Sequence, residues 1–149
     1  MFVSILLGSA SDKEHAQKIA DVLSEYGVTS EITVASAHKV PEKVVDIIKK
    51  LNDRKDPTVV ITVVGMSNGL GGVVAGSCVH PVITCPPFKD HDDYMLNVHS
   101  SLQMPSDVPV MTVLNAKNAA LSALRILGES DADLKKKLLE RIAKIKAGY

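Results

Sequence analysis

The residues best suited to chemistry in this chain lie in a short turn, "SAHK", which spans Ser36–Lys39. His38 carries an imidazole, which can accept and release a proton near neutral pH, and Lys39 places a cation beside it. This combination suits proton transfer on an anionic substrate. A histidine in a loop can equally be a solvated or capping residue, so the pair by itself leaves a structural role open.

The turn "GSASD", Gly8–Asp12, offers groups that suit a phosphate. Its backbone N–H groups and the hydroxyls of Ser9 and Ser11 lie at the expected start of a helix, where the helix dipole favours an anion. Asp12 would repel phosphate but suits the hydroxyls of a ribose. Ser11 and Glu14 also have the S-x-x-E spacing of a capping box, so plain helix capping is the alternative interpretation.

A third turn, "GMSNGLGG", covers Gly65–Gly72 and is rich in glycine, which lets a backbone approach a ligand closely. Ser67 and Asn68 add side chains that can form hydrogen bonds. The alternative is a flexible turn that leads into a tightly packed helix. The chain lacks GxxxxGKS/T and has no GxGxxG after its first expected strand, which argues against a P-loop nucleotide hydrolase and a dinucleotide enzyme.

Short β-branched runs alternate with helical patterns along the chain. We expect strands over residues 2–8, 29–36, 58–65, 81–85 and 108–114. We expect helices over residues 12–27, 41–51, 68–78, 115–128 and 132–146. The run 58–65 is almost wholly apolar, which indicates a central strand buried on both faces. Residues 88–108 show no clear pattern, and long segments of this kind often carry function.

This alternation predicts an α/β fold: a three-layer sandwich with a flavodoxin-like, doubly wound parallel sheet and an extra C-terminal amphipathic helix. The apolar stripe of that helix is Leu134, Leu138, Ile142 and Ile145. Such sheets bind ligands at the carboxyl ends of their strands. The three turns follow the first three expected strands, so we expect them to line one cleft. A length of 149 residues fits a single domain, 1–149.

The composition argues against several classes of partner. Lys+Arg and Asp+Glu balance at 17 each, so no global basic field would attract nucleic acid or an anionic membrane. Aromatic residues make up 3% of the chain, which argues against the stacking of bases on side chains. Cys78 and Cys85 do not form a CxxC motif, and the N-terminal run lacks the basic start of a signal peptide. We therefore expect a cytoplasmic protein with free thiols and neither a nucleic-acid nor a membrane partner.

Other polar residues support a site less well. A metal site would draw on His80, His91, Asp92, Asp93 and His99. None of these histidines forms an H-x-x-x-H pair, so a solvated polar loop is the simpler interpretation and we expect no metal. Cys85, inside "PVITCPP", resembles a small buried residue at a strand end more than a nucleophile.

Several ordered stretches together resemble the PurE family of purine biosynthesis over nearly the whole chain: "GSASD", "SAHK", "SNGLGG", "PVITCPP", "SSLQMPSDVPVMTVL" and "NAKNAALSALRILG". The family includes a carboxylase, which adds carbon dioxide to 5-aminoimidazole ribonucleotide (AIR), and a mutase, which acts on N5-carboxyaminoimidazole ribonucleotide. Both yield 4-carboxy-5-aminoimidazole ribonucleotide (CAIR). "SNGLGG" resembles the carboxylase class, since mutases typically carry "GGAAHLPG" there, and Lys39 stands where mutases usually have arginine. The resemblance implies a carboxylase, with the mutase as the alternative.

The resemblance also implies roles for individual residues. It implies a site for the ribose phosphate end, made by Ser9, Ser11, Asp12, Ser36 and Lys39. It implies a second group that faces the aminoimidazole and the carboxyl group: Gly65, Ser67 and Asn68. His38 would remove the proton that C4 still bears after it attacks carbon dioxide, and this chemistry requires no cofactor. A homo-oligomer, an octamer or a tetramer, is implied too, with the last helix packed on a neighbour.

Two residues depart from the carboxylase pattern. Met66 stands where carboxylase-class sequences often have arginine, which removes a candidate contact to carboxylate or phosphate, and Gln103 resembles the mutase class. A hypothesis of a different kind is a non-catalytic module that binds a phosphorylated ligand. That hypothesis predicts that His38→Asn changes neither activity nor ligand affinity.

Overall fold

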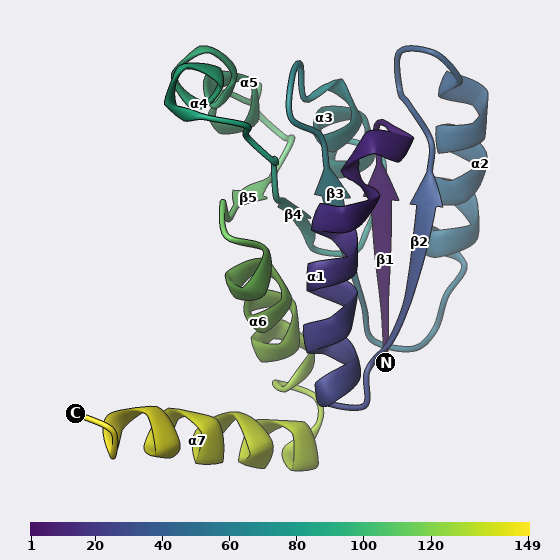
Figure 1. Ribbon diagram of the computed structural model, residues 1–149. Coiled ribbons are helices and arrows are strands. Elements are labelled where there is room, and N and C mark those ends of the chain that lie inside the picture. Colours follow the sequence, from purple (N-terminus) through teal and green to yellow (C-terminus); the bar gives the residue numbers. More distant parts are fainter.

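The apolar runs form a five-stranded parallel sheet in the computed structural model, which describes residues 1–149 (Figure 1). The strands are β1 (Phe2–Leu7), β2 (Thr29–Val34), β3 (Thr58–Val63), β4 (Val82–Thr84) and β5 (Met111–Thr112). Their order is β2-β1-β3-β4-β5, and every neighbouring pair is parallel. All residues of β1 and β3 are buried, as expected for apolar strands inside a sheet.

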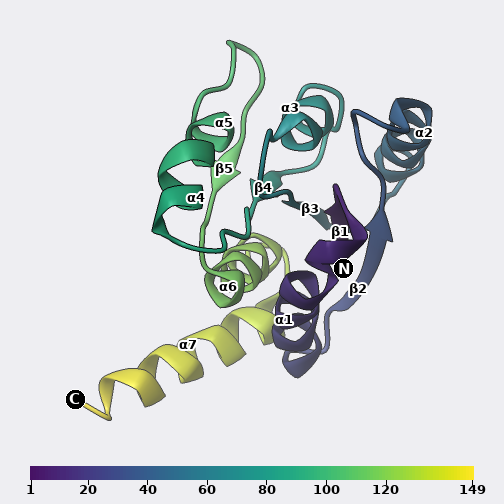
Figure 2. The same cartoon turned by 45° about the horizontal axis from the view of Figure 1, so that its top comes forward.

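Helices cover both faces of this sheet (Figure 2). They are α1 (Lys13–Glu25), α2 (Pro41–Asn52), α3 (Gly69–Ala75), α4 (His91–Asn97), α5 (His99–Leu102), α6 (Ala116–Leu127) and α7 (Ala132–Lys146). Helices α1 and α6 pack on the face that carries Ile5 and Leu7 of β1, whereas α2 and α3 pack on the face that carries Leu6. The predicted three-layer α/β sandwich with a flavodoxin-like parallel sheet is therefore confirmed.

The part of the chain after β4 is less regular than its sequence indicates. Strand β5 covers two residues, not the expected 108–114, and pairs only with Ile83 and Thr84. Pro109 has no backbone N–H group and cannot extend this edge ladder. The unassigned segment 88–108 contains α4 and α5, and the side chain of Asp90 caps α4.

The predicted capping box of Ser11 and Glu14 is wrong, because the chain enters α1 through a different turn. A 3₁₀ turn, η1 (Ala10–Asp12), precedes the helix, and the Ser9 hydroxyl accepts a hydrogen bond from the backbone N–H of Ser11 at 3.3 Å. Because this turn lengthens the loop, α1 begins only at Lys13, and Ser11 lies before its N-cap. Glu14 instead forms an ion pair with Lys18 one turn along the helix.

Helix α7 leaves the sheet region after its first turns (Figure 1). Leu134 and Leu138 are buried in the core formed with α1 and α6, whereas Leu139 and Ile145 are 61% and 51% exposed. Of the predicted apolar stripe, Leu134 and Leu138 are therefore covered, Ile142 is half-buried and Ile145 is uncovered in a single chain, as is Leu139 beside the stripe. None of the helices combines the length and the apolar character needed to cross a membrane.

Candidate active site

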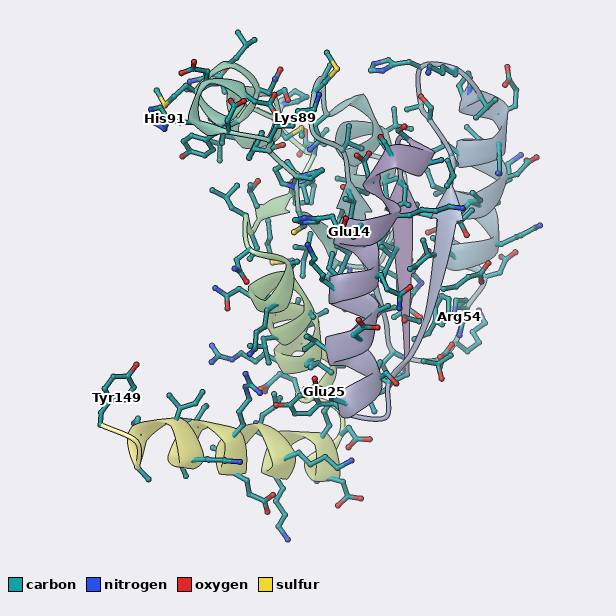
Figure 3. The ribbon with its side chains drawn as sticks, viewed as in Figure 1. Glu14, Glu25, Arg54, Lys89, His91 and Tyr149 are labelled. Carbon is teal, nitrogen blue, oxygen red and sulfur yellow. The ribbon has the colours of Figure 1, made fainter.

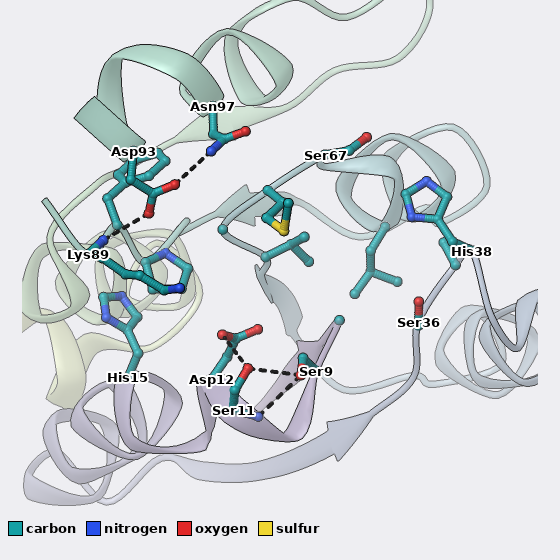
Figure 4. Close-up of a pocket in the computed structure, with 18 of the residues that line it drawn as sticks. Ser9, Ser11, Asp12, His15, Ser36, His38, Ser67, Lys89, Asp93 and Asn97 are labelled. Carbon is teal, nitrogen blue, oxygen red and sulfur yellow. Dashed lines mark hydrogen bonds between the residues drawn. The ribbon is translucent and has the colours of Figure 1, made fainter. Parts of the chain in front are cut away.

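The turns that follow β1, β2, β3 and β4 meet around one cavity of about 920 Å³ (Figure 4). Parallel strands end at the same edge of a sheet, so these turns necessarily lie close together. Only 5 of the 21 lining residues are hydrophobic, which suits a polar ligand. The three predicted turns thus line one cleft, together with the first turns of α1 and the segment between β4 and α4.

Most of the residues predicted to form a site line this cavity. They are Ser9, Ser11, Asp12, Ser36, His38, Lys39, Gly65 and Ser67. Met66, which carries no charge, lines it as well and is 74% exposed. The structure therefore brings together, from three separate turns, the predicted phosphate-binding, ring-facing and proton-transfer groups.

Asn68 is the exception. Its side chain is buried and is fully engaged in the packing of α3 against α5. Its Oδ1 accepts a hydrogen bond from the backbone N–H of Gly71 at 3.0 Å, and its Nδ2 donates to the hydroxyl of Ser101 at 3.0 Å. The predicted contact between this side chain and a ligand does not fit the structure, because Asn68 is the N-cap of α3.

The turn after β1 forms one side of the cavity and presents hydroxyl groups to it (Figure 4). The Ser11 hydroxyl lies 2.9 Å from the Ser9 hydroxyl and 3.3 Å from Oδ1 of Asp12. Burial raises the pKa of the Asp12 carboxyl above its usual value, although the hydrogen bond from Ser11 opposes this effect. The turn can accept hydrogen bonds from a ligand through Asp12 and donate them through its serines and backbone.

His38 is exposed on the turn after β2, and its imidazole lies against the start of α3. A Cβ atom at Gly69 would be 2.6 Å from Nε2 of His38, so the absence of a side chain at this position lets the ring occupy its place. The imidazole is accessible from the cavity and can exchange a proton with a bound molecule.

The turn after β3 is held by contacts to the later part of the chain. A Cβ atom at Gly65 would lie 2.5 Å from the carbonyl oxygen of Pro87, so this glycine allows the two backbones to touch. The Ser100 hydroxyl lies 2.9 Å from the carbonyl oxygen of Met66 and accepts a hydrogen bond from the backbone N–H of Asn68. These contacts fix the turn against α5 and the segment before α4.

His15 is a cavity residue that the sequence did not reveal. Its Nε2 lies 3.4 Å from Sγ of Cys85, and burial lowers the pKa of the imidazole, with Lys18 acting in the same direction. Cys85 is completely buried, as expected of a small residue at a strand end, and this burial raises the pKa of its thiol to about 12, which disfavours the reactive thiolate. His15 follows Asp12 by less than one helical turn. In the sequence, this spacing could have indicated that His15 lies beside the turn Gly8–Asp12.

The segment from Pro87 to Asn97 forms the remaining wall, and its polar residues were predicted to be a solvated loop. Oδ2 of Asp93 accepts a hydrogen bond from the backbone N–H of Lys89 at 2.9 Å, and Oδ1 accepts one from Nδ2 of Asn97 at 2.7 Å (Figure 4). The first of these bonds is the main reason that the pKa of Asp93 is lowered. Only the position after the fourth strand could have pointed to this wall, because the segment has no recognisable motif.

Known proteins are similar to this chain over most of its length. The family described as AIR carboxylase matches residues 2–147. A protein of Archaeoglobus fulgidus named phosphoribosylaminoimidazole carboxylase is 40% identical over 136 residues, which cover 91% of this chain and 74% of that protein. A protein of Methanocaldococcus jannaschii named N5-carboxyaminoimidazole ribonucleotide mutase is 42% identical over 148 residues, which cover 97% of this chain and 90% of that protein.

A solved structure supports the same grouping. The crystal structure of Treponema denticola PurE superposes with a TM-score of 0.92 and 37% sequence identity, over 99% of this chain and 92% of that one. Some relatives are bifunctional, and a match to this chain covers 29% of the length of one of them. The chain belongs to the AIR carboxylase family, as its resemblance to PurE predicted.

Proposed function

We propose that this protein catalyses the reversible carboxylation of AIR with carbon dioxide to give CAIR, a step of de novo purine biosynthesis. One observation carries the proposal: in a chain of this family, an accessible imidazole, His38, lines the same cavity as the hydroxyl-rich turn after β1 and the cation of Lys39. A ribonucleotide requires both a phosphate site and a polar site, and the chemistry requires a base.

The proposed reaction begins with a nucleotide whose ribose phosphate end binds to the turns after β1 and β2. Its site would consist of Ser9, Ser11, Asp12, Ser36 and Lys39. The aminoimidazole would then lie beside the turn that contains Gly65 and Ser67. The position of His38 against the start of α3, next to this turn, supports the arrangement.

In the chemical step, the electron-rich C4 of the imidazole attacks the carbon of carbon dioxide. A carbon–carbon bond forms, and one electron pair of carbon dioxide moves to oxygen. C4 is now tetrahedral and still bears its hydrogen. His38 accepts this hydrogen as a proton, and the electron pair of the C–H bond restores the aromatic ring. In the reverse direction the same imidazole returns the proton, and no cofactor takes part in the proposed reaction.

The mutase is the second candidate, because a relative that covers almost the whole chain carries that name. The uncharged Met66 and the mutase-like Gln103 also depart from the carboxylase pattern. Two assays separate the candidates: purified protein receives AIR with bicarbonate, or N5-carboxyaminoimidazole ribonucleotide, and the formation of CAIR is followed. We expect turnover of AIR. Turnover of the second substrate alone would assign the protein to the mutase class.

The role of His38 is tested by His38→Asn, which keeps a polar side chain but removes the base. We expect turnover to fall about 100-fold or more, with AIR affinity within a few-fold of the wild type. His91→Asn is the matched control, because His91 is exposed and does not line the cavity. An unchanged rate in His38→Asn would favour a module that binds the nucleotide without chemistry.

We also propose that residues 1–149 form one catalytic domain that works in the cytoplasm as a homo-oligomer, an octamer or a tetramer. The presence of all five strands in one sheet supports the single domain. Free thiols at Cys78 and Cys85 support a reducing compartment. The exposed apolar side chains of α7 support assembly with other copies.

A further inference from the structure

Three lysines line the cavity, and their surroundings differ. Lys18 is paired with Glu14, whose Oε1 lies 2.9 Å from its ammonium. Neither Lys39 nor Lys89 takes part in any ion pair of the chain. Arg54, at the opposite end of the sheet (Figure 3), differs from these two lysines, since it pairs with Asp56. The cavity therefore contains two lysine cations that form no ion pair with a carboxylate of the chain.

The backbone of Lys89 is held in place while its ammonium stays free. Its N–H group donates to Oδ2 of Asp93, and the other oxygen of that carboxylate accepts from Asn97. Asp93 thus shapes the segment before α4 and forms no ion pair with the lysine side chain, although the charge of Lys89 is the smallest of the causes that lower the pKa of Asp93. An ammonium that forms no ion pair remains available for a charge-assisted hydrogen bond to an anionic ligand.

Lys89 lies at the end of the cavity that the ring-facing turn occupies. Gly65 of that turn touches the backbone of Pro87. Pro87 lies two residues before Lys89 in the chain. On its other side, Gly69 lies against the imidazole of His38. Figure 4 shows Lys89 and His38 on opposite sides of the cavity. The turn itself contributes no charged side chain, because it consists of glycine, methionine, serine, asparagine and leucine.

We propose that Lys89 binds the carboxylate that is attached to C4 in CAIR. This proposal rests on the proposed function, in which CAIR carries two anionic groups, a phosphate and a carboxylate. The turns after β1 and β2, with Lys39, are assigned to the phosphate. Lys89 is then the only unpaired lysine of the cavity left for the carboxylate.

The same cation assists the chemical step. As C4 attacks carbon dioxide, negative charge develops on the oxygens of the new carboxyl group, and the ammonium of Lys89 stabilises it. The lysine stays protonated throughout, while His38 alone takes the proton from C4. Because carboxylase and mutase form the same 4-carboxylate, the assignment applies to either reaction.

The test compares the binding of two nucleotides that differ only in this carboxylate. AIR and CAIR are titrated calorimetrically into His38→Asn protein, in which CAIR is not consumed during the measurement. Adding Lys89→Met should weaken the binding of CAIR about tenfold or more and change that of AIR less than about twofold. Lys89→Arg should retain most of the affinity for CAIR, since it keeps the charge. Lys55→Met, on an exposed loop at the other end of the sheet, is the matched control.

The possible results are distinct. If Lys89→Met leaves both affinities unchanged, Lys89 does not bind the nucleotide, and the inference is wrong. If both affinities fall equally, the lysine contacts the phosphate, and the assignment to the carboxylate is overturned. If the His38→Asn parent binds neither nucleotide although it is folded by circular dichroism, the proposed function fails together with the inference.

Discussion

The position of the His38 imidazole depends on a residue that carries no side chain. Gly69, the first residue of α3, leaves the space that the ring fills, and a Cβ atom there would lie 2.6 Å from Nε2. Atoms at that distance repel, and the exposed imidazole is the partner that can move. Gly69→Ala should therefore displace the ring and lower kcat about tenfold or more, while the fold is kept.

A second glycine of the same helix provides the control for this change. A Cβ atom at Gly72 would be 3.6 Å from Sδ of Met104, an ordinary contact, so Gly72→Ala should be tolerated. Steady-state kinetics with AIR and bicarbonate compare the two variants, and circular dichroism checks their folding. Equal activity of the Gly69→Ala and Gly72→Ala proteins would show that the close contact with His38 has no part in catalysis.

At the scale of helices and strands, the regular elements could be predicted because their patterns are local. The buried strands appear in the sequence as apolar runs. In α1, α2, α6 and α7 the apolar residues recur at helical spacing. Segment 88–102 has no such pattern, since its order depends on distant contacts such as that between Ser101 and Asn68. The same reason explains His15, whose environment depends on Cys85, 70 residues away in the sequence.

The contact between Asn68 and Ser101 also separates a structural residue from a site residue. Asn68 caps α3 and donates a buried hydrogen bond to α5, so Asn68→Ala loses the cap and leaves the Ser101 hydroxyl without its partner. We expect this variant to lose about 2 kcal/mol of unfolding free energy, as measured by urea denaturation.

Asn115 provides the matched control. It caps α6 through Oδ1, which accepts from the backbone N–H of Asn118, but it makes no second buried contact. Asn115→Ala should therefore cost about 1 kcal/mol, the value of a cap alone. A loss in Asn68→Ala no greater than that in Asn115→Ala would contradict the structural role and return Asn68 to the candidates for ligand binding.

At the scale of the whole molecule, the sheet and its helices account for the cavity but leave part of α7 uncovered. Leu134 and Leu138 complete the core beside α1 and α6, while the C-terminal half of the helix extends beyond the rest of the molecule (Figure 1). Covering the exposed parts of the Leu139 and Ile145 side chains would contribute about 1 kcal/mol each. A second copy of the chain would supply this cover.

Assembly through α7 predicts a change of mass without a loss of fold. Sedimentation velocity at micromolar concentration should give the wild type as a multiple of 15.9 kDa, and Leu139→Glu with Ile145→Glu should shift it towards smaller species. Both side chains are mostly exposed in the single chain, so the subunit itself should stay folded. Lys144→Glu changes the net charge by the same amount at an exposed position of the helix that is turned away from both side chains, and it should leave the mass unchanged. A wild-type monomer would rule out this assembly, whereas a multimer unaffected by the paired glutamates would move the interface to another surface.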